Sequence, residues 1–370
     1  MDLSIPERVR NVEQNSLEPI GSKDRQIYFD VLKIIAAFAV VMLHLSAQHW
    51  FYVKLKTPEW RAFNLYDGSV RFAVPLFVMI SGALFLSKDR PIGSIYGKYV
   101  LRIVTAFLFW STLYAAISLY RGTPLADAVK EAVIGHYHLW YLYMIAGLYM
   151  IVPFLRPVVQ NGKLLRYFLI LSFLVGIVVP QTIAILAVFR PDSAAFVQKV
   201  WAQAYLYLPF GYSFYFVLGY RLDRIELTNR RVILAAVLVI AGTSATVLLT
   251  KRINYYMLDF NLQHKIVLFY QDETVNVAMT AGGIFVLGKR LFRRPCSARA
   301  QKAIAVLSKA TFGVYLVHPI LIDAIRALGL DTITFNPYLS VPVISILVFL
   351  ASLLVSLILN QIPFVKKYFV

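Results

Sequence analysis

Three ionisable side chains interrupt the apolar sequence FDVLKIIAAFAVVMLHLS: Asp30, Lys33 and His44. An ionisable group inside a bilayer costs about 2.5–3.5 kcal/mol on insertion scales, so it usually faces an interior cavity and serves a function. Imidazole titrates at about pH 6.5 and can take a proton from a hydroxyl near neutral pH. His44 is therefore the first candidate for a catalytic base, and Lys33 and Asp30 on the same helix are the other catalytic candidates.

Helical spacing places these side chains on one face. Lys33 and His44 are 11 residues apart, which is about three turns plus 20° and a rise of about 16 Å. Asp30 precedes Lys33 by three residues, on nearly the same face. The face thus carries an ion pair near one membrane surface and an imidazole toward the other. A salt bridge that reaches water and a histidine bonded to a neighbouring helix are the structural alternatives.

A second apolar stretch, RFAVPLFVMISGALF, contains further polar groups. Arg71 is predicted at its outer end, and Ser81 and Gly82 lie ten and eleven residues further in. Gly82 allows another helix to approach closely, and Pro75 weakens a turn. Ser81 suits a hydrogen bond either to a ligand or to a backbone carbonyl.

Two histidine motifs follow. In HYHLWYLYMIAGLYM, His138 and Trp140 are typical of an aromatic belt at the membrane interface. A second histidine two residues before His138 would diverge from it on a helix, so no metal site is expected. In FGVYLVHPILI, Pro319 frees a backbone carbonyl. His318 could satisfy that carbonyl or line the same cavity as His44.

Lys98 and Arg102 begin another apolar stretch, in YGKYVLR. Residues four apart point the same way on a helix. The pair suits the phosphates of a ligand or the headgroups of lipid.

Composition predicts the fold class. Hydrophobic residues make up 59% of the chain and charged residues 15%, against about 45–50% and 25% in soluble domains. We therefore predict an all-α, polytopic integral membrane protein. The net charge of +18 is explained by basic residues that flank membrane helices, so no nucleic-acid partner is expected. Cys296 is the single cysteine, which excludes an intrachain disulfide and a cysteine-based zinc site.

Ten stretches have the roughly 20 mostly apolar residues that a spanning helix needs. They run near residues 28–49, 70–87, 99–120, 138–156, 164–187, 203–220, 231–250, 274–288, 308–328 and 338–361. The polar segment 1–27 has no early apolar run of the kind found in a secretory signal. It is expected to be a disordered cytoplasmic tail before a transmembrane domain at 28–370.

The distribution of basic residues predicts the orientation. With the N-terminus inside, 24 of the 37 Lys and Arg fall in inside segments and 12 in outside segments, while Lys33 lies in the first span. An excess of Lys and Arg on alternate loops marks the cytoplasmic side. Both termini are therefore predicted in the cytoplasm.

Four motifs resemble the membrane-bound acyltransferase-3 family, which includes bacterial O-acetyltransferases of surface polysaccharides such as the enterobacterial common antigen. The motifs are FDVLKIIAAFAVVMLH, RFAVPLFVMISGALF, HLWYLYMIAGLYMIVPFLRP and FGVYLVHPIL, in this order along most of the chain. The first has a basic residue, ten intervening residues and a histidine, here Lys33 and His44.

The resemblance implies transfer of an acyl group, usually acetyl, from cytoplasmic acetyl-CoA to a hydroxyl of a lipid-linked or extracytoplasmic glycan, in the bacterial inner membrane. It implies that His44 is catalytic and that Lys33 takes the family's basic position. Some members have R-x-x-R at the start of the third helix; Lys98 and Arg102, at a different spacing, are the nearest equivalent here and the implied coenzyme A ligands. The candidates for oxyanion stabilisation or the acceptor side are Arg71, Ser81, His138, Trp140 and His318.

A transporter or flippase for a lipid-linked glycan is the main alternative, because ten helices with buried charges suit that function too. Direct transfer and an acyl-histidine intermediate are both compatible with His44. The sequence has no phosphate loop, no H-E-x-x-H motif and no G-x-S-x-G elbow. It leaves the acceptor glycan, the choice between acetyl and another acyl donor, and the oligomeric state open.

Overall fold

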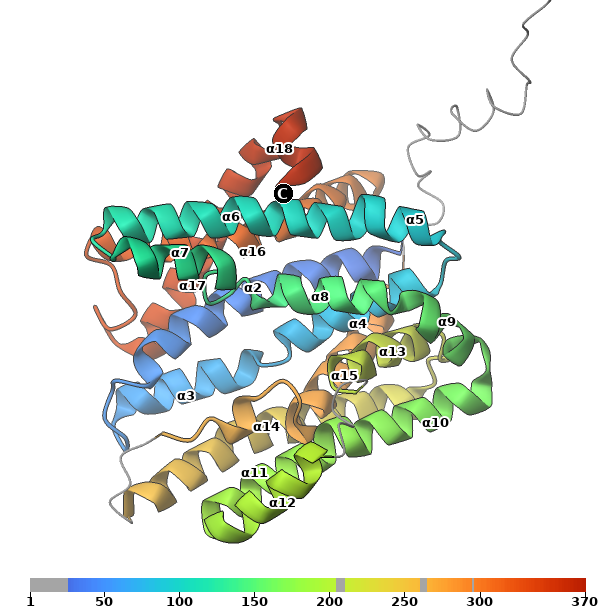
Figure 1. The fold of residues 1–370 in the computed structure, drawn as a ribbon, viewed down its shortest axis with the longest axis horizontal. Coiled ribbons are helices and arrows are strands. Elements are labelled where there is room, and N and C mark those ends of the chain that lie inside the picture. Colours follow the sequence, from blue (N-terminus) through green and yellow to red (C-terminus); the bar gives the residue numbers. More distant parts are fainter. Residues whose placement is uncertain (1–25, 204–209, 260–264, 295) are drawn as a thin grey trace, which may run out of the picture.

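The computed structural model describes residues 26–203, 210–259, 265–294 and 296–370, and the regular elements within them are all helices (Figure 1). The predicted all-α class is therefore confirmed. Of the predicted tail at 1–27, residues 1–25 lie outside the described part of the chain.

Seven helical segments among these residues are long and apolar enough to cross a membrane. They are α2 (Ile27–Trp50), α3 with α4 (Pro58–Val70, Ala73–Leu86), α5 with η1 and α6 (Ile92–Ser94, Ile95–Val100, Leu101–Tyr120), α10 with η2 and α11 (Gly162–Phe173, Leu174–Val178, Val179–Phe189), α14 (Asn229–Asp259), α16 (Ala298–Ala327) and α17 (Pro337–Leu359). An eighth is the pair α8 (Trp140–Met150) and α9 (Val152–Gln160), bent by 58°. Each corresponds to one predicted stretch, as expected for a polytopic membrane protein.

The other two predicted stretches, near 203–220 and 274–288, contain shorter helices. These are α13 (Tyr212–Asp223) and α15 (Val275–Leu291). The remaining elements are α7 (Leu125–Ile134), α12 (Pro191–Gln203), η3 (Leu268–Tyr270) and α18 (Pro363–Tyr368).

Side-chain caps fix where three of the long helices begin. Thr57, Ser297 and Asn336 each accept a hydrogen bond from a backbone N–H two or three residues further along, at 3.2, 3.3 and 3.0 Å. These bonds satisfy N–H groups that have no partner inside the helix. They set the first residues of α3, α16 and α17.

The span formed by α3 and α4 breaks at Arg71 and Phe72. Pro75 explains the break, because it has no N–H for the carbonyl of Arg71 and its ring clashes with that carbonyl. Arg71 consequently lies midway along the 29-residue helical segment Pro58–Leu86, and its place at the outer end of the apolar part stays a prediction. The sequence does not show the full length of this segment, because PEWRAFNLYDGSV, which forms α3, is too polar to look like part of a span.

Two glycines bring α4 and α13 into backbone contact. A Cβ at Gly82 would lie 1.8 Å from the carbonyl oxygen of Phe216, and a Cβ at Gly219 would lie 1.9 Å from that of Met79. Neither position has room for a side chain, so the close helix approach predicted at Gly82 is confirmed. This contact fixes α4, which carries Ser81, against the rest of the bundle.

α2 runs through the middle of the molecule and contacts α3, α4, α15, α16 and α17 (Figure 1). The side of the molecule where α2 begins, at Ile27, is called the near side below, and the side where it ends, at Trp50, is called the far side. His44 lies on the far-side half of this central helix.

Candidate active site

Two histidines from distant parts of the chain meet inside the bundle. Nδ1 of His44 lies 2.8 Å from Nε2 of His318, and the two rings are nearly parallel, with centroids 4.9 Å apart. His318 is fully buried, whereas His44 is half-buried. Nδ1 of His318 lies 2.7 Å from the carbonyl oxygen of Tyr315. Both interpretations of His318 therefore hold, since it satisfies a backbone carbonyl and also borders His44.

Two further histidines extend the cluster. The His138 ring lies 5.3 Å from the His318 ring between centroids, and Nδ1 of His138 is 2.9 Å from Nδ1 of His136. His136 and His138 precede α8 in non-helical backbone, so the divergence expected on a helix does not apply. Tyr137, between them, places its ring edge-on to His44 at 5.2 Å between centroids. Four imidazoles thus gather at this point.

His138 lies in surroundings that disfavour its protonated form. Burial lowers the pKa of His138 well below that of a free imidazole, and the neighbouring histidine rings lower it further. Burial also lowers the pKa of His136. Nε2 of His138 is buried without a hydrogen-bond partner among the described residues. The Leu316 carbonyl beside the His138 ring accepts a hydrogen bond from the Tyr114 hydroxyl at 2.8 Å. A buried polar atom of this kind calls for an explanation, and a ligand is one.

A line of hydroxyl groups connects the cluster with the near side. The hydroxyl of Tyr315 donates to the carbonyl of His138 at 2.5 Å, and the Tyr315 ring lies 5.6 Å from the Tyr141 ring between centroids. Ser81 is a hydrogen-bond neighbour of both Tyr141 and Tyr149. Polar groups therefore continue through the apolar interior from α16 to α4 and α8.

An arginine stands at the near-side end of this line. Tyr149 stacks on Phe85 with centroids 3.9 Å apart, and the Arg90 guanidinium lies 5.0 Å from the Phe85 ring and 4.8 Å from the Tyr99 ring. Arg90 also donates to the Tyr99 hydroxyl, while its Nε is buried without a hydrogen-bond partner in the described part of the chain. Contacts with two aromatic faces hold this positive charge in place.

The structure gives Lys98 and Arg102 different partners. Lys98 lies in η1, a π-helix, whose wider turn alters the alignment that a four-residue spacing gives in an α-helix. The Lys98 side chain is exposed, with its ammonium 5.8 Å from the Tyr99 ring. Arg102 donates to the carbonyl of Val370 and lies 5.8 Å from the Phe312 ring. Their role toward coenzyme A stays a prediction.

Asp30 and Lys33 lie toward the near side. α2 is unbroken from Ile27 to Trp50, so the 11-residue separation of Lys33 from His44 corresponds to about 16 Å along the axis. Asp30 is buried and accepts a hydrogen bond from the Ser308 hydroxyl at 2.6 Å. This bond ties the beginning of α2 to α16, the same helix that carries His318.

Arg71 and Trp140 have separate partners beside the cluster. Arg71 pairs with the buried Asp67 at 2.6 Å, donates to the carbonyl of Tyr270 at 3.3 Å and stacks over the Tyr270 ring at 4.3 Å. It also lies close enough to His44 for the two to interact electrostatically. Trp140 begins α8, is 40% exposed and faces an aromatic ring of α13.

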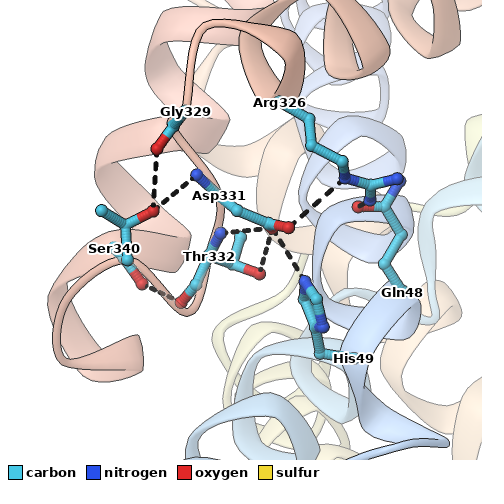
Figure 2. Close-up of polar contacts among 8 residues, drawn as sticks. Gln48, His49, Arg326, Gly329, Asp331, Thr332 and Ser340 are labelled. Atoms are coloured by element: carbon cyan, nitrogen blue, oxygen red, sulfur yellow. Dashed lines mark hydrogen bonds and ion pairs between the residues drawn. The ribbon is translucent and has the colours of Figure 1, made fainter.

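A polar cluster ties the far end of α2 to the loop after α16 (Figure 2). Asp331 accepts a hydrogen bond from Nε2 of His49 at 2.8 Å and pairs with Nε of Arg326 at 3.3 Å. Arg326 in turn donates to the side chain of Gln48. Because His49 is five residues beyond His44 on α2, these contacts hold the segment that carries His44 against α16.

The matched family decides the class of this site. The acyltransferase-3 family model, described as an acyltransferase domain, matches residues 26–361. The chain belongs to the acyltransferase-3 family. No match was found among curated proteins or among solved structures.

Family membership makes the chain an acyltransferase and, with its long apolar helices, a multi-pass membrane protein. The alternative of a glycan transporter is set aside by this result. Within the described residues, no three or more His, Cys, Asp or Glu are placed to hold a metal ion. The His44 cluster offers the acyltransferase proton transfer by imidazole and hydrogen bonding by buried donors.

Sequence reasoning missed several residues of the acyltransferase site. Tyr315 lies three residues before His318 in a motif already singled out, and Tyr137 lies between two named histidines, so both had an available signal. Arg90 had none, because its aromatic partners Phe85 and Tyr99 come together only when η1 folds back beside α4.

Proposed function

We propose that this acyltransferase moves an acyl group, most simply acetyl, from acetyl-CoA at the near side to a hydroxyl of a glycan presented at the far side, with His44 as general base. The observation that carries the proposal is the His44–His318 pair at 2.8 Å inside the bundle. It lies at the end of the line of hydroxyls that begins beside Arg90. A base at this place can meet a donor from one membrane face and an acceptor from the other.

The proposed reaction is one proton-coupled acyl transfer. His44 takes the proton from the acceptor hydroxyl as the hydroxyl oxygen attacks the thioester carbonyl. The new C–O bond forms, the C–S bond breaks, and the coenzyme A thiolate recovers the proton from His44. A two-step route through acyl-His44 is the alternative form, because imidazole is also a nucleophile.

Buried donors around His44 suit the charge that develops on the thioester oxygen. An oxyanion hole needs donors about 2.7–3.1 Å from that oxygen. Nε2 of His138 is the first candidate because it is buried without a partner among the described residues. Ser81 is the second, and Arg71, already bound to Asp67 and Tyr270, contributes through its field. Trp140, at the start of α8, stays the acceptor-side candidate.

The line of hydroxyls supports a donor that enters from the near side. The pantetheine arm of coenzyme A spans roughly 15–20 Å, comparable with the rise of about 16 Å between Lys33 and His44 on α2. Its two amides require hydrogen-bond partners inside an apolar bundle. Ser81, Tyr141 and Tyr149 supply hydroxyls along this path.

The near-side end of that path suits a polyanion. Lys98 and Arg102 are the proposed phosphate ligands, and Arg90, whose Nε has no partner among the described residues, joins them. Guanidinium groups bind phosphate oxygens through two parallel hydrogen bonds. In this proposal Lys33 and Asp30 lie along the donor path rather than at the reacting carbonyl.

The proposed setting is the inner membrane of a bacterium, with the near side in the cytoplasm. Acetyl-CoA is a cytoplasmic metabolite, and the segments predicted inside carry 24 of the 37 Lys and Arg. The acceptor is then a polysaccharide or lipid-linked saccharide of the cell envelope. Its hydroxyl must enter between the far-side ends of the helices that surround His44.

Substitution of His44 tests the proposal directly. We expect His44→Ala to lower the rate of radiolabelled acetyl transfer from acetyl-CoA to the glycans of host membrane vesicles by about 10²–10⁴-fold, the usual effect of losing a general base. Binding of acetyl-CoA, measured by calorimetry on the purified protein, should be little changed.

His49→Gln is the matched control, because it removes a histidine from the same helix while its amide can still donate to Asp331. Thermal unfolding and gel filtration check that both variants are folded. Full transfer by a folded His44→Ala protein would show that His44 is not the base. Absence of acetyl-CoA binding by the folded wild-type protein would contradict the donor assignment.

A further inference from the structure

Pro319 leaves one backbone carbonyl of α16 without its helical donor. In an α-helix the N–H of residue 319 would donate to the carbonyl of residue 315, and proline has no N–H. Pro319 lies well inside α16, 21 residues after Ala298 and eight before Ala327. The carbonyl of Tyr315 must therefore find another donor within a fully buried part of the helix.

His318 supplies that donor from the adjacent position. Its Nδ1 lies 2.7 Å from the carbonyl oxygen of Tyr315, and 3.2 Å from that of Val314. The Val314 carbonyl is the regular helical partner of the His318 backbone N–H, so the shorter contact to Tyr315 is the one that satisfies an unpaired group. The His318 side chain thus replaces the hydrogen bond that Pro319 removes.

A carbonyl only accepts hydrogen bonds, and this fixes the proton on His318. Nδ1 must carry hydrogen to donate to Tyr315, so Nε2 of a neutral His318 presents a lone pair. That lone pair faces Nδ1 of His44 at 2.8 Å, and Nδ1 of His44 must then be the donor. His44 is left with its proton on Nδ1 and a lone pair on Nε2.

We propose that Pro319 and His318 are positioning residues that hold His44 in its Nδ1–H tautomer, so that Nε2 is the nitrogen that takes the acceptor proton. The inference rests on the proposed function and adds a direction to its proton transfer. A neutral histidine in water prefers the other tautomer, with hydrogen on Nε2, which could not act as a base at that nitrogen. The unpaired Tyr315 carbonyl therefore stabilises the Nδ1–H tautomer of His44, which is the less populated tautomer in water.

Burial keeps the His318 ring in this orientation. Its side chain has no exposed surface, and its ring is packed against His44, His138 and Tyr315. A ring flip would leave the Tyr315 carbonyl without a donor, and an unsatisfied buried carbonyl costs about 1–3 kcal/mol. The orientation of both rings is thus determined by one unpaired carbonyl.

The chain of hydrogen bonds also determines where the proton goes. It runs from His44 to His318 and ends on the Tyr315 carbonyl, which cannot pass a proton on. A proton taken from the acceptor hydroxyl by Nε2 of His44 has to leave from the same nitrogen. The coenzyme A thiolate, released as the C–S bond breaks, is the base that takes it, and the products are the O-acyl ester and free thiol.

The first test reads the tautomer without any turnover. Histidine labelled with ¹⁵N in the purified, membrane-reconstituted protein should show His44 protonated at Nδ1 and not at Nε2. In His318→Leu, which cannot accept from His44, the His44 signal should shift toward the Nε2–H form. In Pro319→Ala the restored N–H competes for the Tyr315 carbonyl, and a smaller shift in the same direction is expected. The inference is overturned if His44 of the wild-type protein is protonated at Nε2. It is also overturned if the His44 signal does not change in His318→Leu.

The second test uses a conservative replacement. The amide of His318→Gln can donate to Tyr315 and accept from His44, so the rate of acetyl transfer should stay within about 10-fold of wild type. His318→Leu should lose about 10²-fold or more in kcat with little change in the KM for acetyl-CoA. Equal rates for the Gln and Leu variants would contradict a positioning role. If His44→Ala is inactive in the same assay, that result would still support the proposed function of His44.

Discussion

Asp331 gathers most of the charge-assisted contacts at the far end of α2. Partial burial raises the pKa of this carboxyl, but the hydrogen bond and charge of His49, the Thr332 N–H and the Arg326 guanidinium together lower it below its usual value. A carboxylate of this kind stabilises the folded protein above the pKa of the unfolded chain, about 3.9. The stabilisation is lost as the pH falls through the lower pKa of the folded state.

We therefore expect Asp331→Asn to reduce the free energy of unfolding by about 1 kcal/mol at pH 7, since charged hydrogen bonds contribute about 1.5–3 kcal/mol when buried and less when partly exposed. The difference from wild type should persist down to about pH 5 and shrink below about pH 4. Thermal unfolding in detergent across this range measures it. Asp127→Asn, which removes an exposed pair with Lys130, is the control and should show no such trend. A difference that stays constant to pH 3 would refute the assignment.

For single residues, the sequence identifies candidates for the site more reliably than it predicts which of them are in contact. A histidine inside an apolar stretch is conspicuous, so His44 and His318 are found without coordinates. Their contact is not found, because 274 positions separate them and only the packing of α2 on α16 brings them together. For Arg71 the sequence shows the charge but not that it pairs with the buried Asp67 one helical turn away.

Among the elements, the crossing of α4 and α13 depends on two residues without side chains. A methyl group at Gly82 would lie 1.8 Å from a backbone carbonyl, and no change of rotamer can relieve a clash with backbone. Gly82→Ala is therefore expected to separate the two helices and lower the free energy of unfolding by about 1–3 kcal/mol or more. It should also reduce acyl transfer, because α4 carries Ser81.

Gly147→Ala is the matched control for this prediction. Gly147 lies inside α8, and nothing is within 4 Å of the position its Cβ would take. Alanine there should be neutral or stabilising by up to about 1 kcal/mol, because it is the better helix former. Chemical denaturation of the two variants in detergent compares them. Equal stabilities would show that the α4–α13 contact tolerates a side chain.

Most long elements could be predicted from hydropathy, and the exceptions have physical causes. Hydropathy does not reveal α3, because its sequence is polar and two of its polar side chains, Asn64 and Asp67, are buried against the rest of the protein. The π-helix at Ile95–Val100 leaves no mark in composition, since it differs from an α-helix only in its hydrogen-bond register. It nevertheless changes the outcome for Lys98 and Arg102, whose spacing was interpreted as α-helical.

For the whole molecule, the basic residues around Cys296 predict the orientation in the membrane. Lys289, Arg290, Arg293 and Arg299 flank this exposed cysteine on the near side. The loop after α16, at 328–336, has no Lys or Arg. Positive charge on short loops is retained in the cytoplasm, so α16 should run from the cytoplasm at Ala298 to the outer surface at Ala327.

The single native cysteine makes this orientation directly measurable. A membrane-impermeant maleimide should label Cys296 in inside-out vesicles and leave it unlabelled in right-side-out vesicles. In the variant Cys296→Ser/Ile333→Cys the cysteine moves to the exposed position 333, at the opposite end of α16, and the pattern should reverse. Labelling of Cys296 from the outer surface would invert the topology. It would place Arg90 and the line of hydroxyls on the side that lacks acetyl-CoA, so the donor path proposed here depends on this result.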